Sequence, residues 1–363
     1  MKCLITTTGF TPATGSVSEF HILIRVADPT LSFPRQLEEI FLAYREASEG
    51  KTVHFRRFFL SDAANQYPLL QDALETLPQA PTSMVQQPPL DGTRIALWIY
   101  ATSPMETPGG VPTHNGYSHY WTGSLVSPGR DSREQMSGIF GRLEQQLEGL
   151  SVASDTVRTW IFVRDVDVNY AGVVEGRKDY FNTIGLTAST HYIASTGIEG
   201  RPPSPKNLVE MDAYSVKGLQ PGQMAYLYAP DNLSPTALYG VTFERGAAIS
   251  YGDRRHIFIS GTASIDKNGQ VLHPGDVSAQ AARMLENIEA LLREGGAGLG
   301  DIAMALVYLR DPADFPAVRS LLQQRCPSLN ALFVHGPVCR PTWLVEMECI
   351  ALVPTGTPAF KAF

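Results

Sequence analysis

Three stretches of the chain carry apolar residues at the three-to-four-residue spacing of an amphipathic helix. Each is followed by a β-rich run that ends in an acidic turn, and then by another short amphipathic stretch. The apolar positions are Leu37, Ile40, Phe41 and Tyr44 in the first stretch, Met136, Ile139, Phe140, Leu143 and Leu147 in the second, and Ala281, Met284, Leu285, Ile288 and Leu292 in the third. This recurrence predicts one structural unit in three diverged copies.

The β-rich runs align on the aspartate that ends each of them. They read TVHFRRFFLSD, TVRTWIFVRD and AMALVYLRD, and they end at Asp62, Asp165 and Asp311. Each copy then closes with a further β-rich segment: RIALWIYA, NLVEMDAYSV or WLVEMECIAL. The last two segments share LVEM, so the second and third copies are the more alike in this segment.

A pair of β-rich segments precedes each long helix, beginning at Phe20, His119 and His256. Each copy therefore reads β-β-α-β-α-β, and the chain is predicted to have an α/β (α+β) fold. We expect a degenerate first unit at residues 1–102, a second at 117–216, and a third at 250–363 that carries the active site. The Pro- and Gly-rich residues 103–116 and 217–249 are expected to connect them. Because helices cover one face of each sheet, the other faces should meet in a barrel-like core, making an intramolecular pseudo-trimer.

Composition and charge narrow the classes of function. The 363 residues are 44% hydrophobic and 18% charged, as in a globular protein, and a formal net charge of -7 offers no basic surface for nucleic acid. The four cysteines form no CxxC pair, and the eight histidines lack the spacing of metal ligands. No signal peptide or membrane span is indicated. The glycine-rich Glu294–Gly300 follows a helix, unlike a nucleotide-binding loop. We expect a cytoplasmic protein without metal or nucleotide cofactor.

The third copy resembles the YjgF/RidA family of imine deaminases, which are homotrimers with active sites at subunit clefts. The resemblance rests on ISGTASID, the helix after HPGDVSAQ, VYLRDPADFPAVR and VEMECIAL. The whole chain, with YGVTFERG and VCRPTWLVEME, is more similar to the chorismatases, fused members of this superfamily that remove or rearrange the enolpyruvyl group of chorismate. The resemblance implies a cofactor-independent enzyme with a small-molecule substrate. An internal trimer implies a monomer or weak dimer.

One position departs from the deaminase pattern. In the deaminases an arginine that begins the penultimate strand binds the substrate carboxylate, whereas the matching position here falls near Asn330 and Ala331. This departure disfavours imine hydrolysis. The resemblance implies conversion of chorismate to 3-hydroxybenzoate, alone or with 4-hydroxybenzoate, plus pyruvate. The alternatives are hydrolysis to dihydroxy-dihydrobenzoate and pyruvate, a RidA-like deaminase, and a non-catalytic pseudo-trimer that binds a metabolite.

Glu346 is the predicted catalytic acid. The strand period of two places Glu346 and Glu348 on one face, where two carboxylates favour a shifted pKa, although arginine-paired sheet carboxylates are the alternative. Glu346 matches the acid of the chorismatases, which protonates the methylene carbon of the enol ether and then stabilises the cation. The first copy has Ala96 at this place, and the second has Glu210.

Cys339 precedes Glu346 by seven residues. A small buried thiol is the alternative interpretation. A cysteine at this spacing resembles the chorismatases that make 3-hydroxybenzoate by an intramolecular route, in which a thiol shapes the pocket or relays a proton. Arg340 follows it directly.

Chorismate carries two carboxylates, and the planar guanidinium is suited to binding them. Arg245 and Arg201 lie in loop or strand-end segments that resemble the chorismatase pattern, and Arg158 follows as a candidate. Solvated or ion-paired strand arginines are the alternative. The remaining substrate-binding candidates are hydroxyl-bearing side chains near the same segments, namely Tyr239, Ser260 and Thr262.

Overall fold

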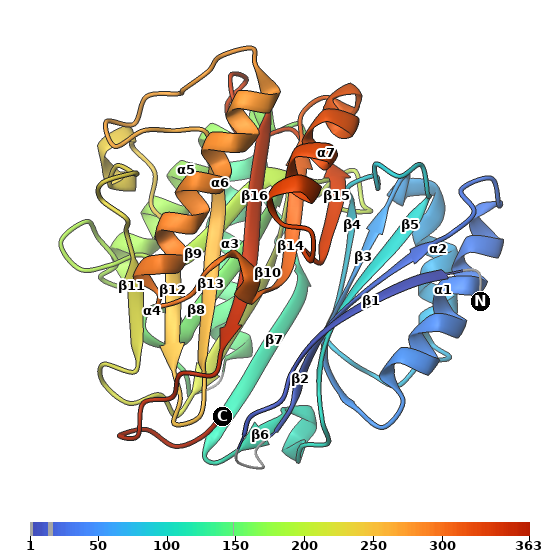
Figure 1. The fold of residues 1–363 in the computed structure, drawn as a ribbon, viewed down its shortest axis with the longest axis horizontal. Helices are drawn as coiled ribbons and strands as arrows, with labels where there is room; N and C mark the ends of the chain where they lie inside the picture. Colours follow the sequence, from blue (N-terminus) through green and yellow to red (C-terminus); the bar gives the residue numbers. More distant parts are fainter. Residues whose placement is uncertain (1–2, 14–16, 148) are drawn as a thin grey trace.

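Three similar α/β units make up the chain in a computed structural model that describes residues 3–13, 17–147 and 149–363 (Figure 1). The first unit contains β1 (Cys3–Phe10), β2 (Glu19–Val26), α1 (Phe33–Ser48), β3 (Thr52–Leu60), α2 (Ala63–Leu74), β4 (Thr82–Gln86) and β5 (Ile95–Thr102). The second contains β6 (Thr113–His114), β7 (Tyr117–Leu125), α3 (Ser132–Gln146), α4 (Val152–Asp155), β8 (Thr156–Val163), α5 (Val166–Thr183), β9 (Ala194–Glu199) and β10 (Val209–Lys217). The third contains β11 (Met224–Leu227), β12 (Gly246–Ser250), β13 (Arg255–Ala263), α6 (Val277–Glu294), β14 (Ile302–Leu309), α7 (Phe315–Arg325), β15 (Ala331–His335) and β16 (Val345–Val353).

Strand order is the same in the three units. The sheets run β1-β2-β5-β3-β4, β6-β7-β10-β8-β9 and β12-β13-β16-β14-β15, and β11 extends the third sheet at its edge. The last strand pair of each order is parallel and its other pairs are antiparallel. The predicted α/β fold of three related units is therefore confirmed.

Two features differ from the sequence expectation. Each unit has an additional short parallel strand, β4, β9 or β15, whose few residues gave no clear period. Residues 217–249, expected to belong to no copy, contain β11 and most of β12. In the third sheet β12 has the position that β1 and β6 have in the other two, so this segment is part of the third unit.

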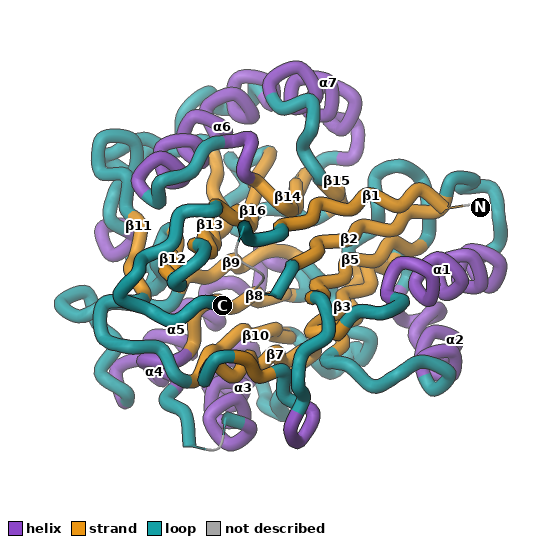
Figure 2. The backbone as a smooth tube through the Cα atoms, turned by 60° about the horizontal axis from the view of Figure 1, so that its bottom comes forward, coloured by secondary structure: helices purple, strands orange, loops and turns teal. Residues whose placement is uncertain are grey.

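The helices lie on the outside and the sheets meet in the middle (Figure 2). The apolar stripe of each long helix is buried against its own sheet, as expected: Ile40 and Tyr44 in α1, Met136 and Phe140 in α3. A closed barrel is not formed, since each of the described sheets is an open series of strands. The inward faces instead pack together as three sheets around one core.

Aromatic rings join the units in that core. Trp98 of the first unit lies with its ring centroid 6.2 Å from that of Trp160 in the second, and Tyr214 of the second lies 5.5 Å from Phe258 of the third. All four side chains are almost fully buried. Rings in such contact contribute beyond the area they bury, so the three units form one packed body.

Buried histidines lie at one end of this core. Burial lowers the pKa of His21 to about 4 and that of His54 to about 3, and it also lowers the pKa of His119 well below its usual range. In the unfolded chain these groups titrate near 6.5. Between about pH 6.5 and pH 4 the unfolded chain therefore binds protons that the folded chain does not, and the folded state loses stability as the pH falls.

We expect the free energy of unfolding to fall from pH 7 to pH 5, with a slope that approaches about 1.4 kcal/mol per pH unit for each such histidine below about pH 6.5. Replacing His54 with Gln should reduce the slope by about one histidine's share. Equilibrium urea unfolding at several pH values measures it, and a flat dependence in the unmodified protein would contradict the expectation.

Candidate active site

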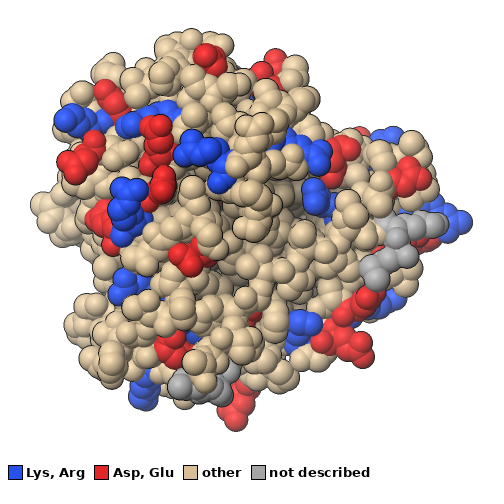
Figure 3. Space-filling model, in the orientation of Figure 1, with Lys and Arg blue, Asp and Glu red and all other residues tan. Residues whose placement is uncertain are grey.

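A cavity of about 420 Å³ opens between the second and third units. Its wall is built from α5 (Tyr170, Val174, Arg177), β9 (Ser195, Thr196), the segment before β12 (Gly240, Val241, Phe243, Arg245), β13 (Gly261, Ala263), the loop before β16 (Cys339, Arg340, Trp343) and Glu346 at the start of β16. The volume is in the range of small-molecule sites. On the face drawn in Figure 3, basic and acidic side chains are interspersed over the surface.

Glu346 reaches the cavity because a bulge in β13 makes room for it. The pairing of β13 with β16 shifts register between Ile259 and Thr262, and Gly261 lies in that interval. A Cβ atom at Gly261 would overlap Oε1 of Glu346. Bulges of this kind re-aim side chains beside functional sites.

The carboxyl of Glu346 is held protonated near neutral pH. Burial, followed by repulsion from Glu348, raises its pKa to about 8, and Arg158 and Arg245 oppose the shift. Only 5% of the residue is exposed. A group of this kind can donate a proton at neutral pH and leaves a carboxylate beside the product cation.

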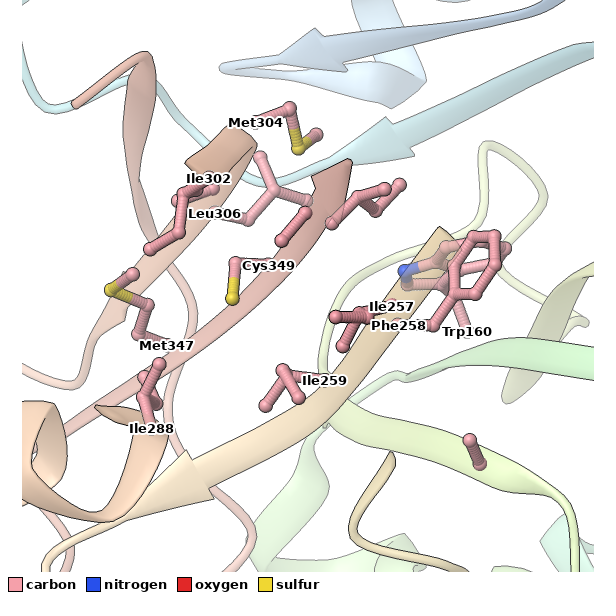
Figure 4. Close-up of a cluster of buried hydrophobic side chains, with 14 of the residues drawn as sticks. Trp160, Ile257, Phe258, Ile259, Ile288, Ile302, Met304, Leu306, Met347 and Cys349 are labelled. Carbon is pink, nitrogen blue, oxygen red and sulfur yellow. The ribbon is translucent and has the colours of Figure 1, made fainter. Parts of the chain in front are cut away.

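Cys339 lies in the same wall and contacts Tyr170 of α5 through a hydrogen bond. Burial raises the pKa of its thiol to about 12, and the Glu346 charge adds to the shift. The thiol is therefore protonated at neutral pH, which makes it a poor nucleophile. The other side of β16 carries Cys349, which lies in an apolar cluster with Ile259 and Ile288 (Figure 4).

The guanidinium groups of Arg177, Arg245 and Arg340 border the cavity. Arg177 is 1% exposed; its Nε donates to Oγ1 of Thr242 at 3.0 Å, and its Nη2 has no hydrogen-bond partner among the described residues. Arg245 donates to the Ser234 carbonyl at 3.0 Å. A buried donor without a partner is costly, so this wall suits an anionic ligand.

The predicted site residues differ in where the structure places them. Glu346, Cys339, Arg340 and Arg245 line the cavity. Three others are fully buried behind the cavity wall: Arg158, Ser260 and Thr262. Arg158 pairs with Glu348. Ser260 donates a hydrogen bond to the Glu244 carbonyl, and Thr262 donates one to the Ser260 carbonyl. Tyr239 ends a short 3-10 helix, Thr236–Tyr239, and its side chain lies outside the described part of the structure.

Arg201 is not brought to this cavity. It lies half-exposed in a separate hollow, where its guanidinium pairs with Asp165 at 2.9 Å and with Glu199 at 3.4 Å. The Pro-rich sequence around Arg201 correctly predicted a loop. That loop follows the C-terminal end of β9, whereas the cavity is lined by Ser195, Thr196 and Gly197 nearer the start of the strand. The guanidinium of Arg201 is therefore already paired with two carboxylates of the protein.

Sequence reasoning missed Tyr170 and Arg177. Both lie on the face of α5 that also buries Val166, Val173 and Phe181. Arg177 could have been identified from the sequence, because it lies four residues before Phe181, on the apolar face of the predicted helix.

The absent deaminase arginine can also be placed. In the second unit the equivalent strand is β9, which contributes to the cavity wall, and the positions equivalent to Asn330 and Ala331 are Ala194 and Ser195. Both are small buried residues, so no arginine begins the strand on the cavity side.

No group of three or more His, Cys, Asp or Glu side chains is arranged to hold a metal ion within residues 3–13, 17–147 and 149–363. None of the helices in these ranges is long and apolar enough to cross a membrane.

Comparison with known proteins assigns the third unit to a family. A family model described as endoribonuclease L-PSP matches residues 247–353. The 3-aminoacrylate deaminase RutC of Acinetobacter baylyi is 31% identical over 99 residues, which are 27% of this chain and 79% of the relative. A RutC family protein of Pyrococcus abyssi is 35% identical over 97 residues, 26% of this chain and 76% of the relative.

Two longer similarities cover more than the third unit. The 3-hydroxybenzoate synthase of Streptomyces hygroscopicus is 26% identical over 266 residues, 66% of this chain and 75% of the relative. A chorismatase crystal structure superposes with a TM-score of 0.63 at 20% identity, over 83% of this chain and 93% of the other. That structure shares the fold of all three units. The three fused units share their architecture with this chorismatase. By its similarity to the two RutC relatives, the chain belongs to the RutC family.

Proposed function

We propose that the protein is a chorismatase that converts chorismate to 3-hydroxybenzoate and pyruvate, with Glu346 as the acid. The observation that carries the proposal is a buried carboxyl with a raised pKa in a cavity bordered by arginines. The similarity to a 3-hydroxybenzoate synthase and to a chorismatase fold supports it. No cofactor is required by this chemistry.

The chemistry assigns a task to each group. Protonation of the enol-ether methylene carbon by Glu346 creates an oxocarbenium ion, and the remaining carboxylate stabilises that ion. Arg177, Arg245 and Arg340 would orient the two carboxylates of the substrate. In the intramolecular route the ring hydroxyl of the substrate, and not water, reacts with the cation. The products 3-hydroxybenzoate and pyruvate then together contain all atoms of chorismate. In the hydrolytic route the products contain one additional water.

Incubation of the purified protein with chorismate tests the proposal. We expect 3-hydroxybenzoate and pyruvate in equal amounts by chromatography and a coupled pyruvate assay. Dihydroxy-dihydrobenzoate with equal pyruvate would indicate the hydrolytic reaction at the same site. Absence of pyruvate would contradict the proposal, and turnover of an imine would indicate deamination.

Replacing Cys339 with Ala should change the products more than the rate. The substitution removes the thiol that contacts Tyr170 and opens a space of about one sulfur atom beside the ring. A water in that space would compete with the ring hydroxyl, so part of the product should shift to the dihydrodiol. The ratio of the two products by chromatography measures the effect.

Cys349→Ala provides the matched control, because it removes a buried thiol from the opposite side of β16. The product ratio of this variant should match that of the unmodified protein. An unchanged ratio in Cys339→Ala would make Cys339 an ordinary buried thiol and withdraw the aromatic product, while chorismate would stay the substrate.

A further inference from the structure

Glu348 lies two residues after Glu346 on the same face of β16, one step deeper in the core. It accepts hydrogen bonds from three donors: Nη2 of Arg158 at 2.7 Å, Nε1 of Trp160 at 2.8 Å, and Oγ1 of Thr196. All three donors come from the second unit, whereas Glu348 belongs to the third. Such a set of donors, one of them a guanidinium, complements the acceptor oxygens of a carboxylate.

The hydroxyl of Thr196 fixes this arrangement. Its oxygen accepts from the Gly261 amide at 2.8 Å and from Nη2 of Arg158. A hydroxyl has one proton, so that proton is directed at Glu348. Gly261 is the residue that leaves room for Glu346, and the hydroxyl thus connects the bulge beneath Glu346 with Glu348.

We infer that Glu348, paired with Arg158 across the unit boundary, is a positioning residue that keeps Glu346 in its protonated form by repulsion between two carboxylates on one strand face. The inference rests on the proposed role of Glu346. Glu348 itself does not line the cavity, so it acts on the substrate only through Glu346.

Several other groups surround Glu346 and set the background for this effect. Those that line the cavity with it are Tyr170, Glu175, Arg177 and Lys178 of α5, Arg245 before β12, and Cys339 and Arg340 in the loop before β16. Tyr308 of β14 is its partner across the sheet. The cationic groups among them favour the ionised form of Glu346, and burial and Glu348 oppose them.

The boundary between the first and second units repeats the charge arrangement around a glutamate that is 1% exposed. Asp212 takes the place of Glu348 on β10 and pairs with Arg57 of the first unit at 2.8 Å. Glu210 takes the place of Glu346, and burial, with repulsion from Asp212, raises its pKa to about 8. Ser124 donates to Glu210 at 2.7 Å in this closed interface. The repeat gives a control within the same molecule.

The pH dependence of kcat/KM for chorismate tests the inference. Glu346 donates only when protonated, so activity should fall as the pH rises through its pKa, about 8. In Glu348→Gln the repulsion is gone, and this basic midpoint should move down by about one pH unit or more. Glu348→Asp keeps the charge and should restore most of the midpoint. Asp212→Asn likewise leaves a buried arginine, Arg57, without its carboxylate partner. Because this pair lies at the other unit boundary, the basic midpoint assigned to Glu346 should not change.

A substrate-free measurement separates this inference from the proposed function. The side-chain carboxyl of Glu346, labelled with ¹³C and assigned by its loss in Glu346→Gln, is titrated by NMR in each protein. A midpoint that does not move in Glu348→Gln overturns the inference whether or not chorismate is turned over. If the single variant does not fold, the neutral pair Arg158→Met with Glu348→Gln replaces it. Its midpoint should fall by less, because Glu348 raises the pKa of Glu346 more than Arg158 lowers it.

Discussion

Glu346→Gln is expected to lower the turnover of chorismate by at least about a hundredfold, the lower end of what a positioned acid contributes. Glutamine is nearly isosteric and fits the space that Gly261 leaves, so the protein should stay folded. Because the amide cannot donate a proton to carbon, the loss should appear in kcat more than in KM. Steady-state kinetics with chorismate, alongside a thermal melt, measure both.

Glu210→Gln is the matched control for this variant. Glu210 has the equivalent strand position and a similarly raised pKa, but it lies in a closed interface where Ser124 occupies it. Its substitution should leave the activity close to that of the unmodified protein. Turnover within about threefold of normal in Glu346→Gln would remove Glu346 from the mechanism.

Arg177→Met should reduce kcat/KM by about 30-fold to several thousandfold. The side chain lines the cavity, is fixed by Thr242 and Ser195, and keeps a buried Nη2 without a hydrogen-bond partner among the described residues. Removing one partner of a buried charge pair costs about 2–5 kcal/mol, at about 1.4 kcal/mol per factor of ten. Most of the loss should appear in KM if the anchored carboxylate binds equally in the ground state.

Two variants interpret the result for Arg177. Arg177→Lys keeps the charge but not the planar fork and should retain an intermediate activity. Arg201→Met removes an arginine that pairs with Asp165 outside the cavity, and its kinetics should stay normal. If Arg177→Met folds and has unchanged kinetics, the carboxylates of the substrate are bound elsewhere in the cavity.

Repeats and periodicity were sufficient to predict the architecture from the sequence. Apolar stripes mark helices because a helix on a sheet must bury one face, and the stripes of α1, α3 and α6 did so. The aspartates at Asp62, Asp165 and Asp311 stand at the N-terminal ends of α2, α5 and the turn before α7, and of the three only Asp311 caps its turn with the side chain. The short parallel strands escaped prediction, since five or six residues carry too little pattern.

The strand period also placed Glu346 and Glu348 on one face, and the resemblance to chorismatases selected Glu346 and Cys339, which line the cavity. These inferences needed only neighbours along the chain. What the tertiary structure alone decided is which arginines share the cavity with them. Arg177 arrives from a helix of the second unit and Arg201 is turned into another hollow. Packing between units, which has no local trace in sequence, sets both positions, and it also sets the partner of Glu348 across the unit boundary.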